Sequence, residues 1–483
     1  MKEKLRTIMT VIVAVMFFIG VCFIVSTHEA WLDEAQAWLI SERLSIIDIF
    51  KQMKYEGHPC LWHLILSIFS KNGYPYEAIG YISAAISSIM VFFLVKKSPF
   101  SIATMFVIIV SPVILYQYSV VCRVYCIAVL GLVLIASLYK DRREKPILYG
   151  LALAFLTNTH IVMAGVVGAL CVIFYGYEFL LHFKEYTKKE KQKIFISMGI
   201  VLASIGILII QLYSSLDLSG TVRKVPFFAG IPIYDQIKLL NTSDAFLRSI
   251  TGDLWQRVTM YILAIVFIIM SIKKHPKETF IAVISIIYIF GINLFVYRLA
   301  VHTKYMIFLF CMFATWIVLV NENNKIKKVI YEVMLIFVMF INMLNNYSDV
   351  FADIRTNYSG AIGVAEYINR EIEDGSVILT TRDDEITPII PYLKKDIKFI
   401  NLNTERETIF CIWDEFKQTR LSGDELISNV EKYKNKYENV YLIIPWGYVM
   451  EEVEDMKDGL DIEMIYEYKY TMVLEKYELF KIN

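Results

Sequence analysis

The sequence predicts a polytopic α-helical membrane protein that carries a separate α/β domain at its C-terminal end. Of the 483 residues, 57% are hydrophobic and 14% aromatic, and the mean hydropathy is +0.51. A soluble domain would be roughly 45–50% apolar. Long apolar runs fill residues 1–350, whereas the chain from residue 349 onward contains 28 Asp and Glu against 16 Lys and Arg. Two different kinds of polypeptide are therefore joined, with the boundary between residues 350 and 351.

Eleven apolar runs are candidates for membrane-spanning helices. A crossing needs about 20 apolar residues and rarely fewer than about 17, so the runs at 147–158 and 258–272 are short. The first run lacks a small-residue cleavage site and is longer than a signal-peptide core, so we expect a retained helix. The eleven runs lie at residues 7–26, 77–95, 100–117, 124–139, 147–158, 161–181, 194–213, 258–272, 279–297, 305–320 and 329–346.

The Lys and Arg residues predict how these spans are oriented. Short cytoplasmic loops of membrane proteins are rich in both residues. With eleven spans, every basic connection falls on the side of the N-terminus, which is therefore expected to be cytoplasmic. The loop 214–257 and the chain after residue 346 are then outside the cytoplasm. The basic connections are residues 2–6, 96–97, 140–145, 184–193, 273–277 and 325–328.

The first predicted external segment contains two adjacent acids, Asp33 and Glu34, in the stretch "WLDEAQAW". From residue 33 to residue 53 apolar residues recur at helical spacing, which predicts one helix lying in the membrane interface, with Trp38 at headgroup depth. A second apolar piece at 58–71 has a proline suited to a first helical turn and is too short to span. We expect these two pieces, which make up residues 33–71, to cover a cavity at the outer membrane surface.

Two explanations account for Asp33, and both stay open at this point. Asp33 and Gln36 have nearly the spacing of a capping box, and an acid at a helix start complements the helix dipole. However, a carboxylate pair beside hydrocarbon, followed by Glu56 and His58 on the same face, is costly unless it serves a function. Capping and catalysis are compatible, because a cap would hold the carboxylate in place.

Residues 351–483 predict a soluble, mostly parallel α/β domain of three layers. Helical patterns separate its strands, and Ser422 is placed to cap one of these helices. The domain has no Gly-rich phosphate loop and no His or Cys cluster, so a structural or acceptor-docking role is favoured over a second active site. The predicted strands are short β-branched runs at residues 377–381, 397–402 and 440–445.

The stretch "WLDEAQAW…RLS…YEGHPCLWHLIL" resembles the first external loop of bacterial GT-C glycosyltransferases. These polytopic enzymes take a sugar from a polyprenyl-phosphate carrier and are related to protein O-mannosyltransferases and lipid A aminoarabinose transferases. The acid pair after the first span carries the likeness, and Cys60 stands where relatives have a second proline. "CRVYCIAVL" is similar to the family's Arg-x-Tyr, here Arg123 and Tyr125. "TNTHIVMAG" is similar to the segment with its outward-facing His, here His160, and "RLAVHTKYMIFLF" to its basic-aromatic start of a late span.

The resemblance implies an inverting transfer of a sugar from a polyprenyl phosphate to an acceptor outside the cytoplasm, which could be a glycan, a lipid or a protein. Such a transfer needs a base for the acceptor hydroxyl, and Asp33 is the candidate. It also needs positive charge beside the leaving phosphate, which basic side chains supply. The candidate substrate-binding residues are Glu34, Glu56, His58, Lys71, Arg123, Tyr125, His160, Arg223, Lys224, His302 and Lys304.

Other functions and other roles for these residues stay open. A lipid or glycan transporter or flippase would need similar intramembrane charge, although the chain has no internal repeat. A non-enzymatic assembly protein would tolerate Asp33 without requiring it. The residues His160 and His302 could instead bond nearby carbonyls, and Lys304 could snorkel to the headgroups. The external basic pair, Arg223 and Lys224, could likewise only touch headgroups.

The sequence indicates no certain cofactor. A divalent ion on carboxylate oxygens of the first loop stays open, although the resemblance points mainly to metal-independent relatives. Asp33, Glu34, Glu56 and His58 would be its ligands. Membrane lipids are expected partners. Nucleic acid is not an expected partner, because the basic clusters are short and have no aromatic residues between them.

Overall fold

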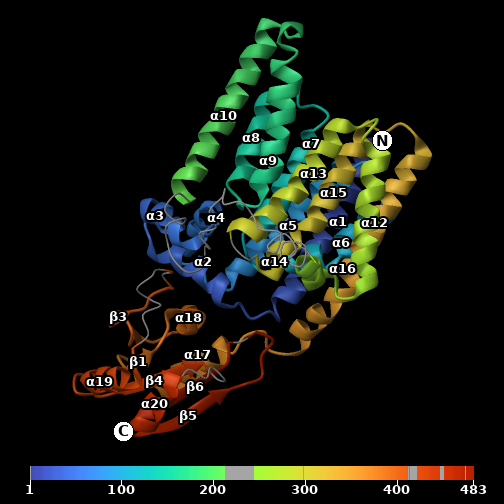
Figure 1. Ribbon diagram of the computed structural model, residues 1–483. Coiled ribbons are helices and arrows are strands. Elements are labelled where there is room, and N and C mark those ends of the chain that lie inside the picture. Colours follow the sequence, from blue (N-terminus) through green and yellow to red (C-terminus); the bar gives the residue numbers. More distant parts are fainter. Residues whose placement is uncertain are drawn as a thin grey trace, which may run out of the picture.

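A computed structural model of the chain describes residues 2–212, 244–296, 299–411, 413, 421–445, 451–473 and 475–483. It consists of a bundle of helices with a small sheet domain at one end (Figure 1). Within the described residues, eight helical segments are long and apolar enough to cross a membrane. These segments agree with the predicted polytopic helical class.

All eleven predicted runs are helical where the structure describes them. The run predicted at 258–272 belongs to an 18-residue helix and is long enough to span, whereas the run at 147–158 stays at 12 residues. The long segments are α1 (Lys2–Val25), α5 (Ala78–Lys97), α9 with η2 (Met163–Leu180), α10 (Lys188–Leu212), α12 (Leu254–Ser271), α13 with η5 (Pro276–Val296), α14 with α15 (Val301–Asn321) and α16 (Lys325–Arg355). The shorter ones are α6 (Ile102–Val110) with η1 (Val113–Gln117), α7 (Tyr125–Leu138) and α8 (Pro146–Thr157).

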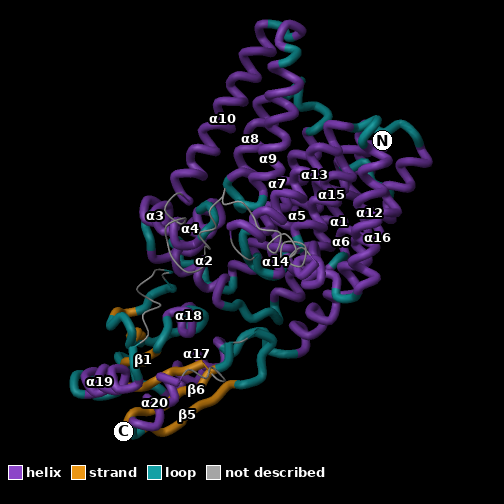
Figure 2. Tube along the Cα trace, viewed as in Figure 1, coloured by secondary structure: helices purple, strands orange, loops and turns teal. Residues whose placement is uncertain are grey.

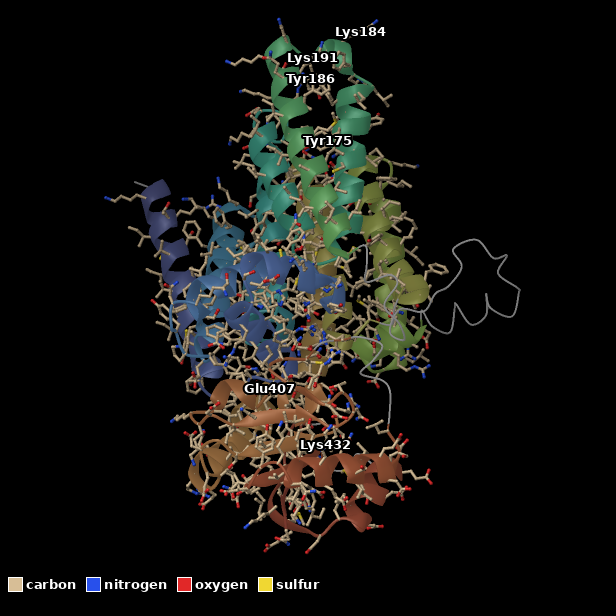
Figure 3. The ribbon with its side chains drawn as sticks, turned by 90° about the vertical axis from the view of Figure 1, so that its left-hand side faces the viewer. Tyr175, Lys184, Tyr186, Lys191, Glu407 and Lys432 are labelled. Carbon is tan, nitrogen blue, oxygen red and sulfur yellow. The ribbon has the colours of Figure 1, made fainter. Side chains whose placement is uncertain are left out.

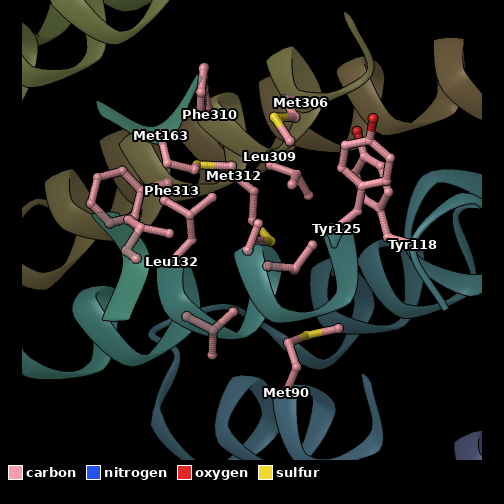
Figure 4. Close-up of a cluster of buried hydrophobic side chains, with 14 of the residues drawn as sticks. Met90, Tyr118, Tyr125, Leu132, Met163, Met306, Leu309, Phe310, Met312 and Phe313 are labelled. Carbon is pink, nitrogen blue, oxygen red and sulfur yellow. The ribbon is translucent and has the colours of Figure 1, made fainter. Parts of the chain in front are cut away.

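Helices α7 and α15 form the centre of the bundle, and most of their side chains are buried. Figure 4 shows Leu132 of α7 close to Leu309 and Met312 of α15. A helix surrounded by protein does not need the full apolar length of a lipid-facing span, which is consistent with the 14 residues of α7. The aromatic rings of Tyr118 and Tyr125 pack together at the edge of this core, with 5.0 Å between their centroids.

The basic connections gather at the end of the bundle that lies away from the sheet domain. Arg142, between α7 and α8, and Lys277, at the start of α13, both pair with Glu178, at 2.6 and 2.7 Å. Figure 3 shows Lys184 at this end and Glu407, in the sheet domain, at the other. The N-terminus also lies at the basic end (Figure 1).

Three short helices lie between the bundle and the sheet domain: α2 (Leu32–Arg43), α3 (Ile46–Glu56) and α4 (Leu61–Ser70). The prediction of one helix over 33–53 is wrong. The hydroxyl of Ser45 accepts a hydrogen bond from the Asp48 amide at 3.2 Å and starts a new helix there. Pro59 precedes α4 instead of lying in its first turn.

Protein covers the apolar face of α2. Trp38 is only 2% exposed and packs against Tyr76, so its predicted place among the lipid headgroups is wrong. Leu39 and Ile40 of α2 form a cluster with Phe410 of the sheet domain. In α3, by contrast, Ile46 and Ile47 are exposed. The amphipathic pattern of α2 therefore reflects burial between the bundle and the C-terminal domain.

The sheet domain confirms the predicted strands, but it is not mostly parallel. The strand order is β3-β2-β1-β4-β6-β5. The predicted strands β1 (Val377–Thr380), β2 (Lys398–Asn401) and β4 (Val440–Pro445) are parallel neighbours at its centre. Both edges are antiparallel, and the unpredicted strands there are β3 (Arg406–Glu407), β5 (Ile462–Tyr468) and β6 (Tyr477–Ile482).

Helices cover both faces of this sheet, so the predicted three layers are present (Figure 2). One face packs on α19 (Gly423–Lys434) and α20 (Glu451–Gly459), and the other on α17 (Ala361–Glu371) and α18 (Asp383–Ile386). Ser422 caps α19 as predicted, because its hydroxyl accepts a hydrogen bond from the Glu425 amide. Helix α16 continues nine residues past the predicted end of its span at 346 and leads directly into the domain.

Candidate functional site

A pocket of about 140 Å³ lies where α2, α3 and α4 meet the start of α7 and the sheet domain. Its lining comes from three stretches that are far apart in sequence: residues 33–63, residues 123–124 and Trp413. Carboxylates, imidazoles, an arginine and indole rings all line it. The lining residues are Asp33, Gln36, Ala37, Glu56, His58, Trp62, His63, Arg123, Val124 and Trp413.

Asp33 and Arg123 form an ion pair in this pocket, with 2.8 Å between Oδ2 and the guanidinium Nη1. Their side chains are 27% and 16% exposed, so the pair is partly open to the cavity. Asp33 is the second residue of α2 and does not cap it, because the N-cap position is Trp31. The capping explanation for Asp33 is therefore wrong, and its carboxylate is directed to Arg123.

The guanidinium of Arg123 lies among residues that the sequence also proposed. It donates a hydrogen bond to Nε2 of His302, which must be unprotonated to accept it. The Arg123 guanidinium also lies 5.4 Å from the centre of the Tyr125 ring. The Tyr125 ring is 5.6 Å from that of His160, and the Tyr125 hydroxyl bonds Thr303 at 2.8 Å. Arg123, Tyr125, His160 and His302 thus come together from three separate segments.

Glu56 and His58 line the same pocket. Glu56 accepts hydrogen bonds from the side-chain amides of Gln36 and Gln52, at 2.9 and 3.1 Å. His58 stacks on His63, with 5.3 Å between the ring centroids. Burial, together with the positive charge of Arg123, lowers the pKa of His58 to about 4. His58 is therefore a neutral imidazole at physiological pH and can both donate and accept a hydrogen bond.

Glu34 does not line the pocket and has a structural environment instead. Its carboxylate is fully buried and accepts hydrogen bonds from the backbone amides of Trp31, at 3.0 Å, and of Cys122. The first bond caps α2, since the leading amides of a helix have no partner within it. The second fastens α2 to the residue that precedes Arg123. Glu34 thus fixes the distance between the two members of the ion pair.

His28 completes this buried network, and the sequence did not indicate it. Its Nε2 lies 3.3 Å from Glu34, and its Nδ1 lies 2.8 Å from Asp353 at the end of α16. Tyr116 also donates to Asp353, at 2.7 Å. Burial alone would lower the pKa of His28, but the two carboxylates raise it to about 10, so the imidazole is charged. The only signal in the sequence was its place just after the first span.

Other proposed residues lie away from the pocket. Lys71 donates to the backbone carbonyls of Glu42 and Leu44, at 3.2 and 2.5 Å, and so holds the far end of α2. Lys304 is 5% exposed and donates to the Ser249 hydroxyl at 3.1 Å, so it does not snorkel to a surface. The external pair at residues 223 and 224, Arg223 and Lys224, falls outside the described residues.

In the part of the chain that the structure describes, no three His, Cys, Asp or Glu side chains are grouped to hold a metal ion. Glu34 is turned away from Asp33 into its buried network, which removes one of the four ligands considered for a divalent ion. The pocket instead offers a carboxylate base, a cation for an anionic group, neutral imidazoles and aromatic rings. No protein family matches the chain, and no curated protein matches it.

The charge of His28 predicts a pH-dependent contribution to stability. Because its pKa in the folded protein is raised above the ordinary 6.5 to about 10, the contribution is complete below pH 6.5 and is lost as pH rises through 10. Breaking a buried ion pair costs about 3–5 kcal/mol. We expect His28→Gln to lower the thermal-melting midpoint strongly at low pH and progressively less toward pH 10.

Melting of the purified protein in detergent across this pH range would measure the difference. His182→Gln is the matched control, since His182 is exposed and lies at the opposite end of the bundle. A deficit of His28→Gln that stays constant with pH would show that the imidazole is not charged in the folded protein.

Proposed function

We propose that the protein is an inverting glycosyltransferase that takes a sugar from a polyprenyl-phosphate carrier and transfers it to an acceptor outside the cytoplasm. The observation that carries this proposal is the ion pair of Asp33 and Arg123 in a pocket at one end of a helical bundle. It places a carboxylate that can accept a proton beside a cation that can bind phosphate, and glycosyl transfer from a lipid phosphate needs both.

In the proposed reaction the donor phosphate binds Arg123 and replaces Asp33 as its partner. Asp33 then accepts the proton of the acceptor hydroxyl while the acceptor oxygen attacks the anomeric carbon opposite the phosphate. The bond from that carbon to the phosphate oxygen breaks, and the phosphate leaves with the electron pair. Its growing charge is stabilised by the guanidinium, which His302 holds in place. One displacement inverts the anomeric centre and leaves no glycosyl-enzyme intermediate.

The two alternatives predict other uses of the pocket. A transporter or flippase would have to pass its cargo between the two ends of the bundle, and an assembly protein would need neither proton transfer nor phosphate binding. The presence of a base candidate and a cation at one end supports transfer over both. The experiments on Asp33 and Arg123 below separate these classes, because neither alternative requires a carboxylate that accepts a proton.

The first test replaces the proposed base. Asp33→Asn keeps the side-chain size and an oxygen for Arg123, but its amide cannot accept the proton, and losing a general base costs about 10²–10⁴ in rate. We expect the glycan product to disappear while the protein level in membranes stays normal. Mass spectrometry of cell-surface glycans from a deletion strain would first identify the product, and the same strain carrying the variant would then be measured.

Glu42→Gln serves as its control, because Glu42 is an exposed acid at the other end of the same helix. Normal product from Asp33→Asn would show that the base lies elsewhere, and Glu56 would be the next candidate.

A second test concerns the binding of the donor phosphate by Arg123. Arg123→Ala removes the positive charge, whereas Arg123→Lys keeps it but loses the planar fork that now contacts both Asp33 and His302. We expect donor use to fall in both variants and further in the alanine variant, seen as product formed against added donor in isolated membranes. Arg142→Lys, at the opposite end of the bundle, should leave donor use unchanged. Normal donor use by both Arg123 variants would make Arg123 a headgroup anchor.

The proposed site requires a particular orientation in the membrane. We place the N-terminus and the basic connections in the cytoplasm, and the pocket with the sheet domain outside. In a cysteine-free background, Asp374→Cys in the sheet domain should react with a membrane-impermeant maleimide in intact cells. Lys188→Cys, in a basic connection, should react only after permeabilisation. Both positions are exposed. The reverse pattern would show that the proposed orientation is wrong, and reaction of both positions on the same side would show that the spans between them are miscounted.

A further inference from the structure

The sheet domain contributes one aromatic residue, Trp413, to the wall of the pocket. Its side chain is 41% exposed although it faces residues of α2, α3 and α4 across the cavity. A large indole left exposed beside charged groups is unusual for a residue that only packs a core, since aromatic residues contribute most when buried or when they bind a ligand.

The backbone two residues before Trp413 is fastened to α2. The Cys411 amide donates to Oε1 of Gln36 at 2.8 Å, and Nε2 of Gln36 donates back to the Cys411 carbonyl at 2.5 Å. Both residues are buried, and Phe410 adds an apolar contact to the same helix. The Gln36 amide also bonds Glu56, so the position of Trp413 is tied to that of an acid in the pocket.

Two buried nitrogen atoms of pocket-lining residues have no hydrogen-bond partner among the described residues. Among the described residues, Nε1 of Trp62 and Nδ1 of His63 are buried and make no hydrogen bond with the protein. Each side chain is 1% exposed. Both nitrogen atoms are covered by the protein, so a bound hydroxyl group would reach them only after a side chain of the pocket wall moves. Nε1 of Trp62 can only donate a hydrogen bond, whereas Nδ1 of His63 accepts or donates according to the tautomer of the ring.

The pocket combines an exposed indole with carboxylates, and these are groups that recognise a pyranose. The C–H face of such a ring stacks on an aromatic side chain, and its hydroxyls pair with the polar atoms around it. A peptide or a lipid headgroup offers fewer hydroxyls and no such face. The chemistry of the wall therefore favours a saccharide.

We propose that the acceptor is a glycan whose terminal pyranose stacks on Trp413, with its attacking hydroxyl directed to Asp33. This deepens the proposed function and rests on it. Arg123 precedes α7 in the bundle and is where the membrane-anchored donor would bind, whereas Trp413 belongs to the sheet domain. The sheet domain is then the part of the enzyme that selects the acceptor.

The test measures binding without turnover. The full chain in lipid nanodiscs is mixed with a panel of methyl pyranosides, and saturation-transfer NMR reports which of them bind. Detergents with sugar headgroups are avoided because they would compete. We expect one or more glycosides to bind, Trp413→Ala to weaken that binding about tenfold or more, and Trp413→Phe to retain part of it. Trp255→Ala removes an exposed indole from α12 and should change nothing.

Each other outcome overturns the assignment. Failure of every glycoside to bind, or equal binding by Trp413→Ala and wild type, would show that Trp413 holds no sugar. Equal weakening by Arg123→Ala and Trp413→Ala would place the sugar with the donor instead. Failure of the proposed chemistry appears in the glycan profile of Asp33→Asn, whereas failure of the acceptor assignment appears in the binding of glycosides by the Trp413 variants.

Discussion

The geometry of the pocket depends on the buried carboxylate of Glu34. A buried carboxylate is stable only where charge and hydrogen bonds compensate the loss of water, and here the His28 cation and two backbone amides do so. One of these amides starts the helix that carries Asp33, and the other precedes Arg123. His28 extends the network to Asp353 at the end of α16. One buried group thus sets the distance between the two residues to which we assign the chemistry.

The sheet domain is fastened to the same helix at two points. At the start of α2, Glu475 accepts a hydrogen bond from the Leu32 amide at 2.8 Å and also bonds Ser359. One turn further along, Gln36 bonds the backbone of Cys411 in both directions. Burial raises the pKa of Glu475 to about 7, so this cap changes its protonation near neutral pH. The sheet domain therefore forms part of the pocket. Helix α2 is the element through which this domain is attached to the helical bundle.

The sequence predicted the features that local patterns encode. Apolar runs predicted the helices, β-branched runs predicted the central strands, and the acid pair was found from charge beside an apolar segment. Arg123 was found from the resemblance of its segment to the Arg-x-Tyr of GT-C glycosyltransferases. Strands β5 and β6 were missed because they are partly exposed and mix charged with apolar residues. The roles of Glu34 and His28 depend on partners up to 325 residues away, and no local pattern contains that information. The sequence pattern did not distinguish Trp413 from other loop residues, and the fold places it in the same pocket as Asp33.

Under the proposed function, the ion pair between Asp33 and Arg123 also sets the order of donor binding and proton transfer. While Arg123 is paired with Asp33, the guanidinium occupies one oxygen of the carboxylate. Arrival of an anionic phosphate at Arg123 takes over that pairing and frees this oxygen to face the acceptor hydroxyl. Donor binding would thus precede proton transfer to Asp33. An acceptor held by Trp413 would not compete for the arginine.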